Sequence, residues 1–363
     1  MADSHQRAEA AIKAFAKGEV VVVTDDDERE NEGDLFVAAA HCTTEKMAFI
    51  IRNTSGIVCV PLGAEQARRL HLEPMVADNE APLGTAFTVS VDVRHGLTTG
   101  ISADERCNTV RALANGKSGP ADFVRPGHVF PLVAREGGVL MRSGHTEACV
   151  DLCRLASLPP VGVLAELMND NGSVMRGPEV AAFAQKYKLV QVSIAELIAY
   201  RQTRDKLVER VGEFQVASEI GTLNGYAYAT PFDRVHHMAF VYGDIGDGKG
   251  VLARLHRADV IGDVFGGAKP IHAALARFKT VGRGVIVFLR DGTAGVPVAE
   301  IPHQGDTDAD AARSRQWREI GLGAQILKDL GISSIRVLTS SKRTYVGLGG
   351  FGIEIVATEP IES

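Results

Sequence analysis

Val20-Val21-Val22-Val23-Thr24 leads directly into Asp25-Asp26-Asp27-Glu28-Arg29-Glu30-Asn31-Glu32-Gly33-Asp34. The first segment has the apolar character of a buried strand, and the second is a loop with seven carboxylates and one arginine. The net charge of this loop, −6, equals that of the whole chain. An isolated acidic run is usually a solvated turn. Carboxylates at a strand end are also what a divalent cation such as Mg²⁺ requires, so other segments must decide between the two interpretations.

The composition indicates an ordinary globular protein of about two domains. Hydrophobic residues make up 45% of the chain. No apolar run approaches the roughly 20 residues of a membrane span, and the N-terminus lacks a signal-peptide core. We therefore expect a cytoplasmic protein with no membrane partner. A sequence pI of about 6.0 offers no basic surface for nucleic acid, which favours a small-molecule ligand.

All five cysteines lie in the first 153 residues. They are Cys42, Cys59, Cys107, Cys149 and Cys153. An odd number of cysteines in a cytosolic chain favours reduced thiols. No residue after Cys153 can supply a thiolate ligand to a metal.

Helical and strand patterns alternate through the first 200 residues. Four short apolar runs predict strands: 20–23, 57–60, 139–141 and 161–167. Ser102 and Ser193 each begin a capping box, which predicts a helix start. Charged residues at 201–206 mark a domain boundary. Beyond it, short strands and a helix predicted over 317–330 indicate a second α/β domain.

The turn Arg142-Ser143-Gly144-His145-Thr146 has the features of an anion site. Gly144 frees the backbone, Thr146 offers a hydroxyl at a helix start, and Arg142 adds a fixed positive fork. Such a turn would hold a phosphate. His145, taken alone, is as compatible with an ordinary first helical residue as with a ligand. Beside a carboxylate cluster, the metal-ligand interpretation of His145 is favoured.

Two other side chains are candidates for proton transfer. The segment Arg125-Pro126-Gly127-His128-Val129-Phe130-Pro131 predicts a stiff loop that presents the His128 imidazole. Glu166 has apolar neighbours near the end of the predicted strand 161–167. Such surroundings raise the pKa of a carboxyl group, which suits proton transfer at neutral pH. A buried, hydrogen-bonded structural glutamate is the alternative. Thr98-Thr99-Gly100-Ile101-Ser102 is either a polar substrate loop or a turn with a helix cap.

Seven ordered segments carry a resemblance to a known family: 26–34, 55–59, 84–89, 98–102, 125–131, 144–147 and 162–167. Together they resemble the 3,4-dihydroxy-2-butanone 4-phosphate synthases of riboflavin biosynthesis. The resemblance implies a lyase that converts D-ribulose 5-phosphate to L-3,4-dihydroxy-2-butanone 4-phosphate and formate. It implies a homodimer that uses Mg²⁺ or Mn²⁺, and we expect one or two ions per site and no zinc. It also implies an α+β fold with a three-layer, mixed-sheet domain, which we assign to residues 1–205.

The resemblance also assigns roles to individual residues. The metal ligands fall on Glu30 and His145, and the essential catalytic residues on His128 and Glu166. The substrate contacts fall on Arg29, Glu30, Asp34, Arg142, Ser143, Gly144, His145, Thr146 and Glu166. The expected chemistry begins with metal polarisation of substrate oxygens and removal of the C3 proton. Loss of the C1 hydroxyl, a skeletal shift and expulsion of C4 as formate would follow.

The second domain, residues 206–363, resembles GTP cyclohydrolase II. The resemblance lies in segments 262–266, 282–285, 323–331 and 345–348. That family binds a catalytic zinc through three cysteines, and the corresponding positions here are Ala258, Pro270 and His272. Because this set contains no thiolate, we expect the domain to be catalytically inactive. The alternatives are a bifunctional enzyme and a module that senses a nucleotide or a flavin.

Overall fold

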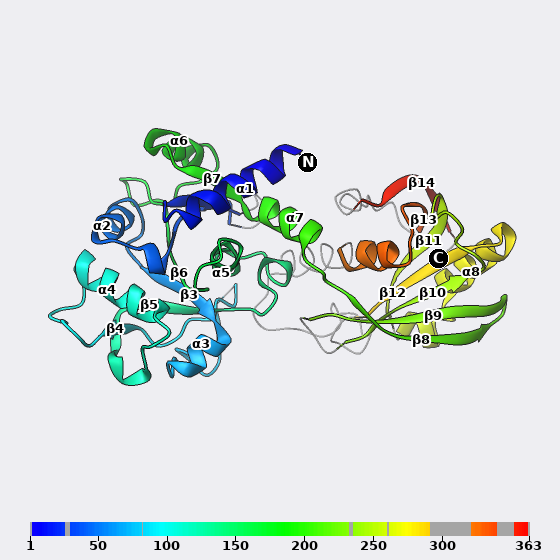
Figure 1. Ribbon diagram of the computed structural model, residues 1–363, viewed down its shortest axis with the longest axis horizontal. Helices are drawn as coiled ribbons and strands as arrows, with labels where there is room; N and C mark the ends of the chain where they lie inside the picture. Colours follow the sequence, from blue (N-terminus) through cyan, green and yellow to red (C-terminus); the bar gives the residue numbers. More distant parts are fainter. Residues whose placement is uncertain are drawn as a thin grey trace. The chain divides into compact units, whose positions relative to one another are not determined.

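The computed structural model describes residues 2–25, 30–81, 83–231, 235–259, 261–290, 321–339 and 352–361. The described residues divide into two compact units, which meet in the sequence at Arg201 and Gln202 (Figure 1). None of the described helices is both long enough and apolar enough to cross a membrane.

The first unit is built on a seven-stranded mixed sheet in the order β4-β5-β3-β6-β2-β1-β7. Its strands are β1 (Val21–Thr24), β2 (Gly33–Ala38), β3 (Cys59–Gly63), β4 (Val91–Val93), β5 (Phe123–Ala134), β6 (Gly162–Glu166) and β7 (Val190–Ser193). Its helices are α1 (Ala2–Ala16), α2 (Thr44–Asn53), α3 (Ala64–Arg69), α4 (Ala103–Ala114), α5 (His145–Leu155), α6 (Pro178–Tyr187) and α7 (Ile194–Arg204). β3 runs parallel to β5 and β1 to β7, whereas the other strand pairs are antiparallel.

Alternation along β2 shows that helices cover both faces of this sheet. Leu35 and Val37 join one hydrophobic cluster with residues of α2 and α4. Phe36 points to the other face, where its ring meets His145 of α5 at a centroid separation of 6.1 Å. Because neighbouring strand residues face opposite sides, the unit has helix, sheet and helix layers. The predicted three-layer, mixed-sheet α+β fold is confirmed.

The second unit has its own seven-stranded sheet, in the order β14-β13-β11-β12-β10-β9-β8 (Figure 1). Its strands are β8 (Glu209–Ser218), β9 (Gly221–Ala229), β10 (His237–Tyr242), β11 (Val251–Arg257), β12 (Gly284–Leu289), β13 (Ser334–Thr339) and β14 (Glu354–Pro360). The pairs β14–β13, β13–β11 and β11–β12 are parallel, whereas β12–β10, β10–β9 and β9–β8 are antiparallel. Helix α8 (Lys269–Val281) buries Phe278 against this sheet, and a second helix spans 321–329.

Both predicted helix caps form. The hydroxyl of Ser102 accepts a hydrogen bond from the Glu105 N–H, and that of Ser193 accepts one from the Glu196 N–H, each at 3.2 Å. The first four residues of the predicted helix 317–330 lie outside the described residues.

Two local predictions were wrong. Residues 139–141 are not a strand, because Gly138–Leu140 forms a short 3₁₀ helix in which Gly138, like Gly137 before it, has a positive φ. The segment around His128 is not a loop but part of β5, which is twelve residues long. A proline-rich segment can remain extended where its N–H groups are not needed by a neighbouring strand.

Candidate active site

The acidic loop joins β1 to β2 and is closed at its base by Asp25. The antiparallel register pairs Thr24 with Gly33, so the loop connects two adjacent strand ends. The Asp25 carboxylate accepts hydrogen bonds from the N–H groups of Glu30, at 3.1 Å, and Glu32, at 2.9 Å. Arg29 falls outside the described residues.

Asp34 and Glu166 lie side by side because β2 and β6 pair at these two residues. Asp34 is only 2% exposed. Burial raises the pKa of Asp34 to about 7, a shift opposed by His145 and reinforced by Glu166 and Glu30. Glu166 is half-buried and accepts a hydrogen bond of 2.7 Å from the Ser55 hydroxyl. Two carboxylates in different surroundings therefore lie next to each other.

His145, the first residue of α5, lies close to two carboxylates of this site. Its Nδ1 lies 3.7 Å from Glu30 Oε2, and its Nε2 lies 3.9 Å from Asp34 Oδ1. These separations exceed ordinary hydrogen-bond lengths. The predicted ligands Glu30 and His145, more than a hundred residues apart in the sequence, are thus neighbours in the fold.

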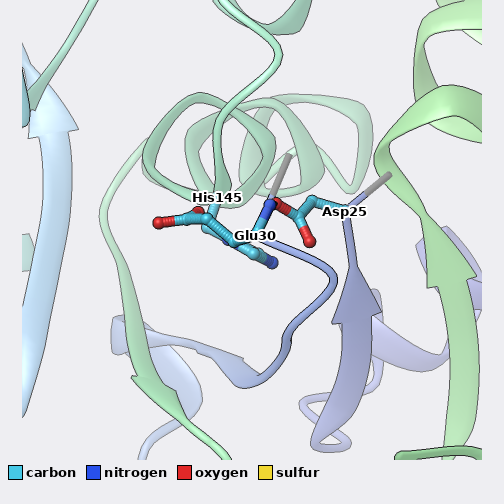
Figure 2. A group of neighbouring side chains, drawn as sticks. All are labelled: Asp25, Glu30 and His145. Carbon is cyan, nitrogen blue, oxygen red and sulfur yellow. The ribbon is translucent and has the colours of Figure 1, made fainter. Parts of the chain in front are cut away.

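Asp25 completes a group that could hold a metal ion. One ligand atom each from Asp25, Glu30 and His145 lies within 4.8 Å of the others (Figure 2). Oxygen ligands with one imidazole suit Mg²⁺ and Mn²⁺. Asp34 Oδ1 is buried and has no hydrogen-bond partner among the described residues, as expected for an atom that faces a cation or substrate. The residues present therefore fit a divalent cation.

The predicted anion turn is fixed by its own side chains. Gly144 is the N-cap of α5, and Thr146 is buried while Ser143 is half-buried. Arg142 Nη1 donates to Glu147 Oε2 at 2.7 Å, and its Nη2 donates to the Leu83 carbonyl at 3.0 Å. The turn therefore presents the N-terminus of α5 beside a guanidinium that is already held in place.

His128 belongs to a different group of residues. Its Nδ1 lies 2.7 Å from Asp92 Oδ2, and its N–H donates to Asp92 Oδ1 at 2.9 Å. Strand β3 separates β5, which carries His128, from β6, which carries Glu166. The described contacts therefore do not bring His128 together with the carboxylate cluster.

The sequence prediction missed two residues of these groups, Asp25 and Asp92. Asp25 was detectable as the first residue after β1. Cys59 is buried, and burial raises the pKa of its thiol, with Glu166 and Asp34 adding to the shift. Asp92, the partner of His128, gives no sequence signal because it stands between two valines of a short strand.

Comparison with known proteins agrees with this geometry. The family model described as 3,4-dihydroxy-2-butanone 4-phosphate synthase matches residues 9–200, and that of GTP cyclohydrolase II matches residues 209–360. Two Arabidopsis thaliana proteins are each 45% identical over 97% of this chain. One is named bifunctional riboflavin biosynthesis protein RIBA 1 and has 68% of its length covered; the other is named monofunctional RIBA 2 and has 76% covered.

Two solved structures are also similar. The structure of RibBX, described as a two-domain 3,4-dihydroxy-2-butanone 4-phosphate synthase from A. baumannii, covers 97% of this chain and 99% of its own, with 34% identity and a TM-score of 0.82. A synthase structure described as a complex with two magnesium ions covers 54% of this chain and 96% of its own, with 47% identity and a TM-score of 0.53. The chain therefore belongs to the 3,4-dihydroxy-2-butanone 4-phosphate synthase family of riboflavin biosynthesis, with a GTP cyclohydrolase II-type unit behind the synthase unit.

Proposed function

We propose that this chain converts D-ribulose 5-phosphate to L-3,4-dihydroxy-2-butanone 4-phosphate and formate. The observation that carries the proposal is the convergence of Glu30, Asp34 and His145 beside the anion turn 142–146. A sugar phosphate needs both parts of this arrangement. The turn offers helix N–H groups to the phosphate, while the carboxylates and the imidazole face the end of the molecule that reacts.

We propose Glu30 and His145 as ligands of Mg²⁺ or Mn²⁺, at one or two ions per site, with Asp25 as a further ligand. The bound cation would polarise carbonyl and hydroxyl oxygens of the substrate. The two N–H groups that Asp25 accepts hold the loop at Glu30 and Glu32. Asp25 therefore positions the Glu30 backbone even where it does not contact the ion.

Proton transfer within the carboxylate cluster is assigned to Glu166 and Asp34. The proposed role of His128, which the described contacts leave outside this cluster, rests on the family resemblance. With a pKa of about 7, Asp34 can take and return a proton near neutral pH. Glu166 next to it is fixed by the Ser55 hydroxyl. The Asp92 carboxylate favours the His128 tautomer with a proton on Nδ1, which leaves Nε2 able to accept one.

We also propose that the synthase unit, residues 1–205, works in a homodimer. The family resemblance supports this assembly state. Size-exclusion chromatography with light scattering of the full chain tests it, since a monomer at assay concentrations would contradict the proposal.

The second unit, residues 206–363, is proposed to lack GTP cyclohydrolase II activity. Every cysteine lies at or before Cys153, so no thiolate zinc site can form there. Pro270 is the second residue of α8, and the His272 Nδ1 lies 2.9 Å from Glu219 Oε1. The relative named bifunctional supports the alternative of an enzyme with two activities, whereas the relative named monofunctional supports a single activity.

Formate release tests the proposed synthase activity. The full chain, supplied with ribulose 5-phosphate and Mg²⁺, should release formate, and chelation should abolish the reaction. Glu30→Gln should reduce the rate by at least about 100-fold, because a charged ligand is lost. Glu65→Gln, a change at an exposed position on α3, is the control and should keep full activity. Absence of formate from the unaltered chain would refute the proposal.

Zinc content and GTP turnover test the second unit. Full-length protein purified without chelators should contain far less than one zinc per chain and should not consume GTP. Stoichiometric zinc together with a pyrimidine product from GTP would establish the bifunctional alternative. A heat of binding with GTP or a flavin, without turnover, would instead support the sensing module.

A further inference from the structure

Glu147 is a buried carboxylate to which no catalytic or binding role has been given above. It lies in the first turn of α5 and is 1% exposed. Its Oε1 accepts the Arg135 N–H at 3.0 Å, and its Oε2 accepts Arg142 Nη1 at 2.7 Å. Burying a carboxylate is costly unless its oxygens have partners. The position of Glu147 is therefore set by the two ends of one loop, residues 135–142.

Arg142 is held just as closely. Its side chain is 13% exposed, and its guanidinium is shared between Glu147 and the Leu83 carbonyl. A Cβ on Gly144 would lie 2.3 Å from Arg142 Nη1 and 2.8 Å from Glu147 Oε2. The guanidinium thus crosses directly over the N-cap of α5, and only a glycine leaves room for it.

This arrangement leaves Arg142 able to bind a further anion. A guanidinium has five N–H donors, and the contacts with Glu147 and Leu83 engage two of them. Fixing the plane of the fork in advance removes most of the rotamer entropy that a free arginine would lose on binding. The Glu147–Arg142 pair is therefore a prearranged donor at the mouth of the anion turn.

We propose that Glu147 is a positioning residue for the phosphate of the substrate and acts by holding the Arg142 fork over the N-terminus of α5. The inference rests on the proposed function, because it assigns the phosphate of ribulose 5-phosphate to this turn. Glu147 itself does not touch the ligand. Its carboxylate fixes where the Arg142 donors point.

Glu147→Gln is the first test. An amide offers one acceptor oxygen, so either Arg135 N–H or Arg142 loses its acceptor and the fork is released. The KM for ribulose 5-phosphate should rise at least about tenfold, with kcat within about threefold of the unaltered chain. The affinity for inorganic phosphate, measured by calorimetry on the full chain, should fall in parallel. The affinity for Mn²⁺ should not change.

A double-substitution cycle with Arg142→Lys separates positioning from a general loss of stability. Lysine cannot reproduce the fork, so Glu147→Gln added to Arg142→Lys should raise KM by less than about twofold more. Asp151→Asn is the matched control. Asp151 is a buried carboxylate one turn further along α5, and it accepts Val139 N–H and Arg201 Nη1 but no donor of Arg142. The fold-change in KM caused by Asp151→Asn should be the same with and without Arg142→Lys.

Glu147→Asp covers the case in which the glutamine variant does not fold. Aspartate keeps the charge on a side chain shorter by one methylene. KM should therefore rise and the phosphate affinity should fall, both by less than in Glu147→Gln. Unchanged KM and phosphate affinity in a folded Glu147 variant would overturn the inference. The inference would also be overturned if Glu147→Gln raised KM by the same factor in the Arg142→Lys chain as in the unaltered chain. If the unaltered chain releases no formate, the proposed function fails. The affinity for inorganic phosphate, measured by calorimetry, still tests whether Glu147 positions Arg142.

Discussion

At the scale of single residues, Asp34 shows how the site conflicts with stability. Its carboxylate is buried, and Oδ1 has no hydrogen-bond partner among the described residues. Burial is the main cause of its raised pKa; His145 opposes the shift, and Glu166 and Glu30 add to it. A buried charge with incomplete pairing is destabilising unless a cation or a proton neutralises it. The buried Asp34 carboxylate therefore serves the chemistry of the site and lowers the stability of the fold.

Asp34→Asn should therefore stabilise the metal-free chain at pH 7–8, by about 1–3 kcal/mol, while abolishing formate release. Urea unfolding in the presence of a chelator measures this difference. Asp151→Asn provides the contrast, because there the carboxylate accepts Val139 N–H and Arg201. That variant should be less stable than the unaltered chain. A destabilised Asp34→Asn variant would contradict our description of the site.

The pH dependence of this effect follows from the raised pKa. Folded Asp34 holds its proton up to about pH 7, whereas in the unfolded chain it releases the proton near the ordinary aspartate pKa of 3.8. Between these values the folded state binds more protons, so stability falls as pH rises. The contribution of Asp34 to the free energy of unfolding should thus decrease from about pH 4 to pH 7 in the metal-free chain. This pH dependence should be absent in Asp34→Asn.

Sequence reasoning located the residues whose chemistry stands out locally. The acidic loop stood out because seven carboxylates follow one strand, and His145 because it sits in a turn suited to anions. The choice of Glu30 and Asp34 within the loop came from the family resemblance. Asp92 was not found, because its role comes from the pairing of β4 with β5. Residues 26–29, including the predicted substrate contact Arg29, lie outside the described residues, so that assignment stays a prediction.

At the scale of elements, the loop before α4 supports His128 from one side. Glu105 in the first turn of α4 accepts the N–H and the hydroxyl of Thr98, and these bonds hold the pKa of Glu105 at about 2. Gly100 in this loop has a φ of +87°. A Cβ there would lie 2.2 Å from Asp92 Oδ2 and 2.6 Å from His128 Nδ1. The loop therefore packs its backbone against the Asp92–His128 pair.

Gly100→Ala should lower kcat by at least about tenfold, because the added methyl group displaces His128 from Asp92. Gly96→Ala is the matched control. Gly96 also has a positive φ, of +76°, but no heavy atom lies within 4 Å of its added Cβ. Both variants should lose about 1–2 kcal/mol of stability from backbone strain, with a further loss in Gly100→Ala from the clash, and only Gly100→Ala should lose activity. Equal activities would show that the contact is unimportant.

The failures of prediction at this scale share a physical cause. Val139-Leu140-Met141 is apolar enough for a strand, but the Val139 N–H is taken by the buried Asp151 carboxylate at 2.8 Å. Prolines around His128 indicated a loop, yet Cys59 to Gly63 of β3 pairs in parallel with 130–134 of β5. Contacts from distant residues overrode local preference in both cases.

At the scale of the whole molecule, each unit has a hydrophobic cluster of its own. The cluster of the first unit gathers residues from β2, β3, β6 and the helices α2 and α4. The cluster of the second unit centres on Phe278 of α8, which is 0% exposed. Domains with separate cores often unfold in separate steps.

Phe278→Ala should therefore lower the unfolding temperature of the second unit alone. Loss of a buried phenylalanine costs about 3–5 kcal/mol. Calorimetry of the full chain should show one transition shifted and the other unchanged, with formate release retained. A parallel loss of formate release would instead show that the synthase depends on the second unit.

The sheet order could not have been obtained from residue patterns. β1 pairs with β7 in parallel, although Val21 and Val190 are far apart in the chain. The mixed sheet was expected through family resemblance, because alternating helix and strand signals alone do not specify strand order. The helix layers were easier to predict, since cap residues such as Ser102 and Ser193 are local signals.

The origin of the proposed ligands also bears on how the chain is made. Asp25 and Glu30 come from the hairpin of β1 and β2, which leaves the ribosome early, whereas His145 is translated more than a hundred residues later. A cation cannot be held by all three until α5 has docked on the finished sheet. It would therefore bind after the folding barrier and slow the loss of the native state without speeding its formation. Metal supply would then govern the lifetime of the folded protein in the cell more than its yield from synthesis.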